Sequence, residues 1–531
     1  PLTDWITSQG RLNIKYAWIG GSVQQSDTLG NVIRNNRDYL FTGKFDLVKF
    51  YNKIPFLKKF NKKSNLISQD SIKSIYDSKF LKTVMRLIMS ARSFNFNYSV
   101  NEGITLAGFQ HSPNFFGMNT GFKSPGWNFV LGSQNPNIRF NASENNWLSR
   151  STSLSSPFLQ TKSEDISLRG SLQPFEFLRI QIDAKRSHSE NFQEIFRYND
   201  LNDSYVSLTP SRGGDFSISY ILIKTAFVKD DNKNNSKVFE NFEENREIIR
   251  SRLNAINSLG EYNLNSQDVL IPAFISAYSD ADPNEISLNP FVKIPLPNWR
   301  IDFSGLSKIK FLSDIFSSIN ISHSYQSLYS IGNYINSLYY DSDLDFSNSF
   351  SDYPLASKQS NNGLIPFYII GQVNILERFS PLIGINIRTK TNLNARVEYR
   401  IERNLTLNLS NSQISEIKNS DISFDFAFSK SKLKLPLKFR GETIILDNDL
   451  QFRMNLILRD TKTIQRKIGG ENILTNGNYN FQFRPNINYS VNDKLNVMVY
   501  YENTINKPSV ANSFPRYASS FGAKLRVNLS Q

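Results

Sequence analysis

The chain has 531 residues, a net charge of +14 and 39% hydrophobic residues, with a mean hydropathy of −0.38. It contains no uninterrupted run of about 18 apolar residues, which a membrane-spanning helix needs, so it is either soluble or crosses a membrane with strands. Cysteine is absent, which excludes disulfides, thiol catalysis and cysteine-ligated metals. The positive charge is dispersed, which favours solvated turns and a basic rim or lumen over nucleic-acid binding.

Alternation of apolar and polar residues first becomes regular at residues 93–100 and recurs at 178–185 and 215–224. In an extended strand, such alternation places the apolar side chains on one face and the polar side chains on the other. Long polar stretches separate these runs, so we expect long loops between the strands of the first half.

Residues 229–297 depart from the strand pattern. A polar loop opens this segment, and a helix is predicted near residues 242–258 from apolar residues at helical spacing: Ile248, Ile249, Leu253 and Ile256. Because a long excursion from a compact domain is usually functional, we predict an extended loop that forms a cap or contacts a partner.

The last third of the chain alternates most regularly. Apolar side chains from Leu393 to Ile401 alternate with polar and charged ones, Glu402–Asn404 suggest a short hairpin turn on the periplasmic side, and the pattern restarts at Leu405. Further runs follow without any helical period: they begin near Ile422, Leu450, Tyr479, Leu495 and Ala523. This order predicts an antiparallel meander.

We therefore predict an all-β protein, a segment of a large antiparallel transmembrane β-barrel that spans residues 1–531 with roughly 16–20 strands. Strands of about 9–11 residues can cross a bilayer when tilted, and an Arg at the lipid midplane costs about 2–4 kcal/mol, so the charged face should line water. The side chains predicted to face the lumen are Arg396, Glu398, Arg400 and Arg453. The side chains predicted to face lipid are Leu393, Val397, Tyr399, Leu405, Leu407, Phe424 and Phe426. A soluble sheet with its charged face in solvent explains the alternation equally well.

No residue constellation indicates catalysis. The three histidines, His111, His188 and His323, form no metal-binding motif, and no glycine-rich loop has the spacing of a phosphate site. We predict no enzymatic activity, no cofactor and no metal.

Seven segments in one order along the chain resemble the SprA/Sov family, the outer-membrane translocon of the type IX secretion system in Bacteroidetes-type bacteria. They are Tyr51–Asn61, Asn101–Phe109, Ser124–Gln134, Asp268–Ser279, Pro295–Ile309, Ser322–Tyr334 and Glu377–Gln413. The resemblance covers the C-terminal part of that family. It implies a very large barrel that passes folded cargo proteins to the cell surface and, in some members, exports gliding adhesins.

The resemblance also implies partners: lipid of the outer membrane, a smaller PorV-like barrel that collects cargo, a periplasmic plug protein and the cargo itself. Family members are much longer than this chain. We therefore expect a fragment, a processed piece or one half of a split protein, which needs the N-terminal remainder of the same barrel. The alternatives are an outer-membrane uptake or binding barrel and a soluble cell-surface β-protein such as an adhesin.

Overall fold

Antiparallel strands make up most of the computed structural model, which describes residues 3–21, 26–61, 84–85, 87–343, 353–360, 363–439, 442–446, 448–492, 494–510 and 513–527. Sixteen strands form one sheet, within the 16–20 predicted, and two small hairpins stand apart from it. The strands are β1 (Ile6–Ile19), β2 (Asn31–Asp46), β3 (Ala91–Phe109), β4 (Phe158–Phe175), β5 (Leu178–Asn199), β6 (Ser204–Ser219), β7 (Asn298–Phe303), β8 (Phe316–Asn336), β9 (Lys358–Ser360), β10 (Gly363–Ile365), β11 (Tyr368–Ile369), β12 (Gln372–Thr389), β13 (Leu393–Asn408), β14 (Gln413–Lys430), β15 (Leu433–Phe439), β16 (Glu442–Leu446), β17 (Leu450–Lys467), β18 (Asn472–Ser490), β19 (Leu495–Pro508) and β20 (Arg516–Val527).

Helices occur in the links between strands. They are α1 (Ser26–Leu29), α2 (Leu47–Lys53), α3 (Pro55–Asn61), α5 (Trp127–Val130), α6 (Ile138–Glu144), α7 (Lys237–Ile256), α8 (Gln267–Ser279) and α9 (Lys310–Ile315), with 3-10 turns η2 (Phe115–Gly117), η3 (Gly305–Lys308) and η4 (Leu338–Asp343). None of these helices is both long enough and apolar enough to cross a bilayer.

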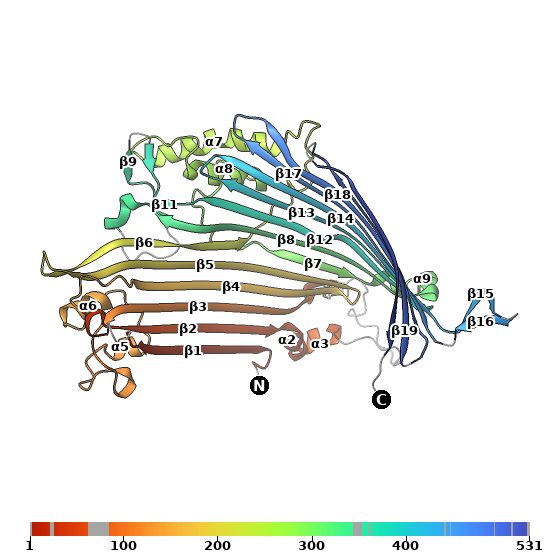
Figure 1. Ribbon diagram of the computed structural model, residues 1–531, viewed down its shortest axis with the longest axis horizontal. Coiled ribbons are helices and arrows are strands. Elements are labelled where there is room, and N and C mark those ends of the chain that lie inside the picture. The colour runs from red at the N-terminus through yellow and green to blue at the C-terminus, as the bar shows by residue number, and fades with distance from the viewer. Residues whose placement is uncertain are drawn as a thin grey trace.

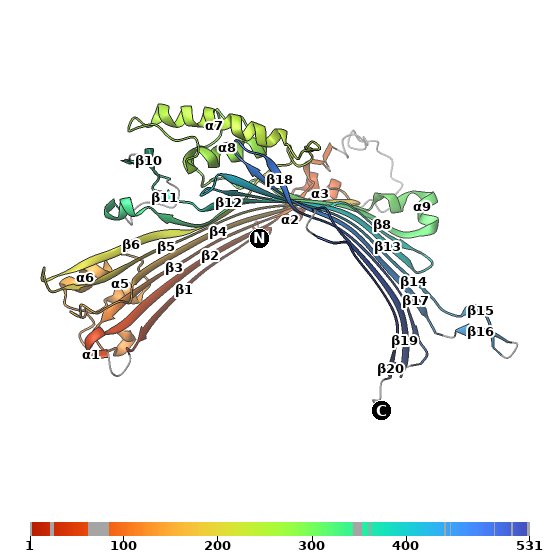
Figure 2. The ribbon, with the colours of Figure 1, turned by 45° about the horizontal axis from the view of Figure 1, so that its top comes forward.

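The sheet is an open, strongly curved surface (Figures 1 and 2). Its order is β1-β2-β3-β4-β5-β6-β8-β12-β13-β14-β17-β18-β19-β20, so strands that follow each other along the chain are neighbours in space. In the described part of the chain, β1 pairs with β2 alone and β20 with β19 alone. Two edges therefore carry backbone groups without a strand partner there.

The two ends of the sheet carry different links. The end named here the α9 end holds the turns 176–177, 390–392 and 491–494, and the links with α2, α3, α9 and the β15–β16 hairpin. The opposite end, the α7 end, holds the turns 200–203, 409–412 and 468–471, and the links with α5, α6 and η4. Helices α7 and α8 lie at this end, over the ends of the strands (Figure 1).

Register gives the sheet one apolar and one polar face, because directly paired residues of neighbouring antiparallel strands project to the same side. A row across six strands contains Ile321, Ile385, Val397, Phe424, Leu456 and Phe483. The next row, one residue along each strand, contains Asn320, Asn386, Arg396, Asp425, Asn455 and Arg484. These rows define the apolar face and the polar face.

The predicted turn at Glu402–Asn404 is wrong. Strand β13 runs without a break through these residues, and Arg403 pairs with Glu377 of β12 and Lys418 of β14. The three polar residues continue the strand because both neighbouring strands pair with it through all three positions, and Arg378 and Glu377 of β12 lie beside Glu402 and Arg403. The turns lie at residues 390–392 and 409–412.

One position in the sheet is shared by two strands. Strand β5 pairs with β7 through residues 178–183 and with β6 through residues 186–199, and β6 and β7 both pair with β8. The chain leaves the sheet after Ser219 and returns at Asn298. Strand β6 therefore ends before the predicted run at 215–224 does.

Side-chain hydrogen bonds replace backbone hydrogen bonds of the sheet where the strand is interrupted. Ser219 Oγ accepts a hydrogen bond from the backbone N–H of Lys185 (3.0 Å) and donates one to the carbonyl of Leu296 (2.7 Å). Asn298 Oδ1 accepts from the backbone N–H of Ser327 (2.8 Å). A 78-residue segment can thus leave the middle of the sheet without leaving buried backbone amides unpaired.

This segment, the insertion 220–297, begins nine residues before the predicted excursion and contains a second helix, α8, that the periodicity did not reveal. Every residue of α8 from Asp268 to Tyr278 is buried, so its sequence is apolar on all sides and shows no helical stripe. The insertion packs against the α7 end of β6, β8, β12, β13 and β14 in one hydrophobic core. A second core joins the link with α5 and α6 to β2–β5.

Candidate functional site

The polar face carries the four side chains predicted to face a lumen. Glu398 is buried between Arg396, whose Nε lies 2.7 Å from Glu398 Oε1, and Arg400, which contacts the other carboxylate oxygen. The two guanidinium groups remain about half exposed, so the three charges form a partly exposed cluster on the polar face. Arg453 lies on β17, four residue positions along the strands from the row that contains Glu398, and it belongs to a different group of side chains.

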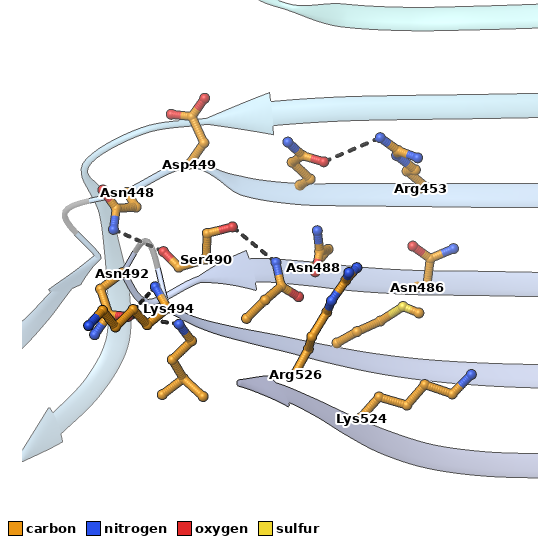
Figure 3. Close-up of a pocket in the computed structure, with 14 residues that line it drawn as sticks. Asn448, Asp449, Arg453, Asn486, Asn488, Ser490, Asn492, Lys494, Lys524 and Arg526 are labelled. Carbon is orange, nitrogen blue, oxygen red and sulfur yellow. Dashed lines mark hydrogen bonds between the residues drawn. The ribbon is translucent and has the colours of Figure 1, made fainter. Parts of the chain in front are cut away.

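Arg453 lines a hollow of about 780 Å³ on the polar face, at the α9 end of β17–β20 (Figure 3). The residues labelled in Figure 3 are Asn448, Asp449, Arg453, Asn486, Asn488, Ser490, Asn492, Lys494, Lys524 and Arg526. Amide and hydroxyl side chains share this surface with four cations, and the hydrogen bonds drawn include one from Arg453 to Gln451 (3.3 Å). The hollow is therefore a polar surface with an excess of positive charge.

A second polar hollow, of about 550 Å³, lies across β2–β6. Short neutral residues line much of it, and the charged residues Asp38, Glu102, Lys162, Glu190 and Asp215 also line it. The short neutral residues are Asn36, Asn101, Thr161, Ser163, Ser189, Asn191, Ser211, Gly213 and Gly214. Gly214 is required here, since a Cβ atom would lie 1.9 Å from the carbonyl oxygen of Ser189. The polar face is therefore hydrophilic and hollowed at two places.

The apolar face carries the seven side chains predicted to face lipid, in two different settings. Leu393, Val397, Tyr399, Phe424 and Phe426 lie in the half of the face nearer the α9 end, where no helix covers them. They are partly exposed, as are Ile383 (55%) and Ile422 (43%) beside them. We name this uncovered half, from Leu393 to Ile401 on β13 and its paired rows, the apolar band.

Leu405 and Leu407 lie outside this band, and their predicted contact with lipid is wrong. Both are fully buried in the core that the insertion makes with the sheet. Alternation alone could not separate them from Leu393 or Val397, because all these residues are on the same face of one strand. The difference comes from the insertion 220–297, which ends more than a hundred residues before Leu405.

A line of charges crosses the apolar face where the band ends. We name it the charged belt, and its members are Arg37, Glu102, Lys162, Glu164, Arg186, Glu377, Arg403, Glu416, Lys418 and Arg466. Its ion pairs include Arg37–Glu102 (2.7 Å), Arg186–Glu164 (3.4 Å), Arg403–Glu377 (2.8 Å) and Arg466–Glu416 (2.6 Å). Beyond the belt, the link 110–157 covers the apolar face of β2–β5, and the insertion 220–297 covers that of β6, β8 and β12–β14.

The belt also holds the insertion 220–297 in place. Arg466 is fully buried and contacts Glu416 of β14 and Asp230 of the insertion, at 2.9 Å. Arg403 donates to the carbonyl of Thr225 (3.1 Å) and pairs with Glu377, which accepts from the hydroxyl of Tyr325 (2.8 Å). The insertion is thus joined to the sheet by buried, hydrogen-bonded charges as well as by apolar packing.

The structure gives little support for a chemical site. His188 is buried and contacts the Tyr334 hydroxyl, and His323 contacts the carbonyl of Leu382. Within the described ranges, no three His, Asp or Glu side chains lie close enough to bind a metal ion.

No family model matches the sequence, and no curated protein matches it. Solved structures similar to the chain include the RagAB peptide transporter (6% identity, TM-score 0.28, 94% of this chain and 49% of that one). Others are the ferric-catecholate import receptor Fiu from E. coli K12 (6%, TM-score 0.23, 98% and 61%) and P. aeruginosa FpvA bound to pyoverdine (6%, TM-score 0.26, 95% and 55%). The chain spans about half to three-fifths of the length of these proteins.

Proposed function

We propose that the chain is part of the wall of a protein-conducting channel in the outer membrane of a Gram-negative, Bacteroidetes-type bacterium. In this proposal the channel passes folded secreted proteins to the cell surface and is gated by partner proteins. The observation that carries it is the division of one continuous sheet into a polar face and an uncovered apolar band.

The dimensions of the apolar band fit a bilayer. On β13 the band runs for nine residues, from Leu393 to Ile401, before Arg403 begins the charged belt. At about 3.3 Å per residue, nine residues cover about 30 Å along the strand, and a tilt of about 40° reduces this to about 23 Å. Outer-membrane barrels have an apolar band of about 25 Å. Contiguous exposed apolar surface of this kind requires a partner, and lipid fits its shape and chemistry.

The strands are longer than the predicted length of about 9–11 residues, because they continue beyond the part that a bilayer crossing needs. Strand β5 has 22 residues and β8 has 21. Their remaining length lies beyond the charged belt, where the insertions cover it. In the proposed orientation the α7 end therefore lies outside the bilayer. It lies on the cell-surface side, because outer-membrane barrels carry their long loops there.

The polar face supports a passive pore. Its side chains are mainly Asn, Ser and Thr with local ion pairs, which keep the wall hydrated and offer a passing protein few strong contacts. The sequence resemblance adds the rest of the proposal: a smaller PorV-like barrel that delivers cargo, a periplasmic plug protein, and a role in gliding where adhesins are the cargo. The open edges at β1 and β20 fit a wall that the N-terminal remainder of the barrel completes.

A photo-crosslinking residue in living cells tests the proposal. Placed at Asn455, on the polar face, it should trap secreted folded proteins, and placed at Val397, on the apolar band, it should not. Depletion of the chain should reduce secreted proteins at the cell surface. If the residue at Asn455 crosslinked to components of a small-molecule uptake system, and depletion of the chain left secretion unchanged, the proposal would be contradicted. An uptake barrel would then be favoured.

A further inference from the structure

The link between β7 and β8, residues 304–315, is longer and more apolar than a strand connection needs. The neighbouring β12–β13 connection uses three residues, whereas this link contains η3 and α9. Three of its five large apolar side chains are exposed, namely Ile309 (50%), Phe311 (73%) and Ile315 (48%), whereas Leu306 and Leu312 are half-buried. In both views α9 stands off the strand ends (Figures 1 and 2).

The link is firmly held, so its exposure is not that of a loose loop. Ser307 Oγ accepts from the backbone N–H of Ile319 (2.7 Å) and donates to its carbonyl (3.2 Å). The backbone N–H of Ser304 donates to the carbonyl oxygen of Phe177 (2.8 Å). The backbone N–H of Lys390 donates to the carbonyl oxygen of Ile315 (3.2 Å). These bonds fix the link to strand β8 and to the β4–β5 and β12–β13 turns at the α9 end.

The link continues the apolar band. It is attached next to Phe303 and Ile319, which pair with Ile321 and Ile387 on the apolar face. Gly305 allows this close approach, since a Cβ atom there would lie 2.6 Å from the Phe303 ring and 2.9 Å from the Phe177 ring. The exposed residues of the link therefore lie at the rim of the band and extend its apolar surface.

Charged groups surround this apolar surface without dominating it. Lys308 lies 3.4 Å from Glu176 and over the Phe177 ring, and Lys310 and Lys390 are exposed. Asp314 is the carboxylate of the link itself, whereas Glu176 belongs to the β4–β5 turn. Three cations and two carboxylates leave a net charge of +1, so apolar burial provides most of the binding, and the lysines can reach headgroup phosphates while their stems lie along lipid.

We propose that residues 304–315 form an interfacial membrane anchor. Ile309, Phe311 and Ile315 enter the boundary between headgroups and acyl chains of the leaflet at the α9 end, and Lys308 and Lys310 contact phospholipid phosphates. Short amphipathic segments bind bilayers in this way. The inference rests on the proposed function only in requiring that the apolar band faces lipid.

The absence of cysteine makes the test direct, because each single-cysteine variant carries one reporter. The full chain is reconstituted in phosphatidylcholine–phosphatidylglycerol vesicles with an environment-sensitive fluorophore at Phe311→Cys. Lipids with a quencher at a shallow acyl position should quench it severalfold more than lipids with a deep quencher. A fluorophore at Leu201→Cys should stay unquenched, since Leu201 is 92% exposed in the β5–β6 turn at the opposite end.

A third variant, Val397→Cys, separates the two proposals. Quenching at position 397 without quenching at 311 overturns the anchor and leaves the membrane wall intact. Absence of quenching at both positions overturns the membrane wall as well. A reporter at 311 that neither lipid quenchers nor aqueous iodide reach would indicate a protein partner, and this result also overturns the anchor.

Discussion

Asp268 shows how a single buried group controls the insertion. It lies in the first turn of α8, outside the strands, and accepts a hydrogen bond from the Tyr353 hydroxyl. Burial raises its pKa from 3.8 to about 6, although the Tyr353 hydroxyl acts in the opposite direction. Between these two values the folded chain binds a proton more tightly than the unfolded chain, so the insertion loses stability as the pH rises.

Replacing Asp268 by Asn should remove this pH dependence. The amide oxygen still accepts from Tyr353, and no charge is buried above pH 6, so we expect the insertion to gain at most about 3 kcal/mol at pH 7.5. Hydrogen exchange of residues 220–297 between pH 4 and 7.5, corrected for intrinsic rates, measures the effect. Asp280→Asn, at an exposed carboxyl of the same insertion, is the control, and an equal effect there would contradict the assignment to Asp268.

Arg466 is the residue whose loss should loosen the insertion most. Arg466→Met leaves Glu416 and Asp230 buried with Lys418 as their remaining cation, and breaking a buried pair costs about 3–5 kcal/mol. The matched control is Arg459→Met, which removes an exposed pair with Asp421 on the polar face and should cost about 1 kcal/mol or less. Limited proteolysis of the insertion measures both, and equal protection would refute the role of Arg466.

At the scale of elements, the interrupted strand between β5 and β8 is the most unusual feature. Two side chains, Ser219 and Asn298, replace backbone partners at the exit and return of the insertion. The sheet at this point depends on side-chain chemistry that ordinary strands do not need.

Ser219→Ala should therefore weaken the sheet locally. The N–H of Lys185 and the carbonyl of Leu296 lose a partner, and a buried unsatisfied group costs about 1–3 kcal/mol. Hydrogen exchange should accelerate at Lys185 and remain unchanged in β18. Ser217→Ala, two residues earlier in β6, is the control, and a similar acceleration there would show that the loss is not specific to the repair.

Alternation predicted the strands of the last third well because each of these strands keeps one apolar face. It failed at Glu402–Asn404, where a polar triplet resembles a turn but continues β13 beside the charges of β12 and β14. It also failed for α8, since a helix buried on all sides shows no period. The residues predicted to face a lumen, Arg396, Glu398 and Arg400, could be placed on one face from their spacing. In contrast, Arg403 contacts a residue that is 178 positions away in the sequence, and Arg466 contacts one that is 236 positions away.

At the scale of the whole molecule, the apolar face is divided by the charged belt into a part that contacts protein and a part that is uncovered. The sequence predicts which residues share this face, but it cannot predict the division, because residues 110–157 and 220–297 cover the far half from distant positions in the chain. The sheet curvature and its open edges likewise arise from the packing of many strands. The uncovered half is the surface on which a membrane function depends.

Three arginine substitutions test this division in one experiment. Val397→Arg places a charge in the apolar band and should lower the free energy of unfolding in a bilayer by about 2–4 kcal/mol. Asn455→Arg, one row away on the polar face, should change it by less than about 1 kcal/mol, since the added charge is hydrated there. Leu407→Arg should destabilise the chain in bilayers and in detergent alike, because it disrupts the protein core under the insertion. Reversible urea unfolding in thin-acyl-chain vesicles and in detergent micelles measures all three, and a penalty at Val397 no larger than that at Asn455 would mean that the apolar band does not face lipid.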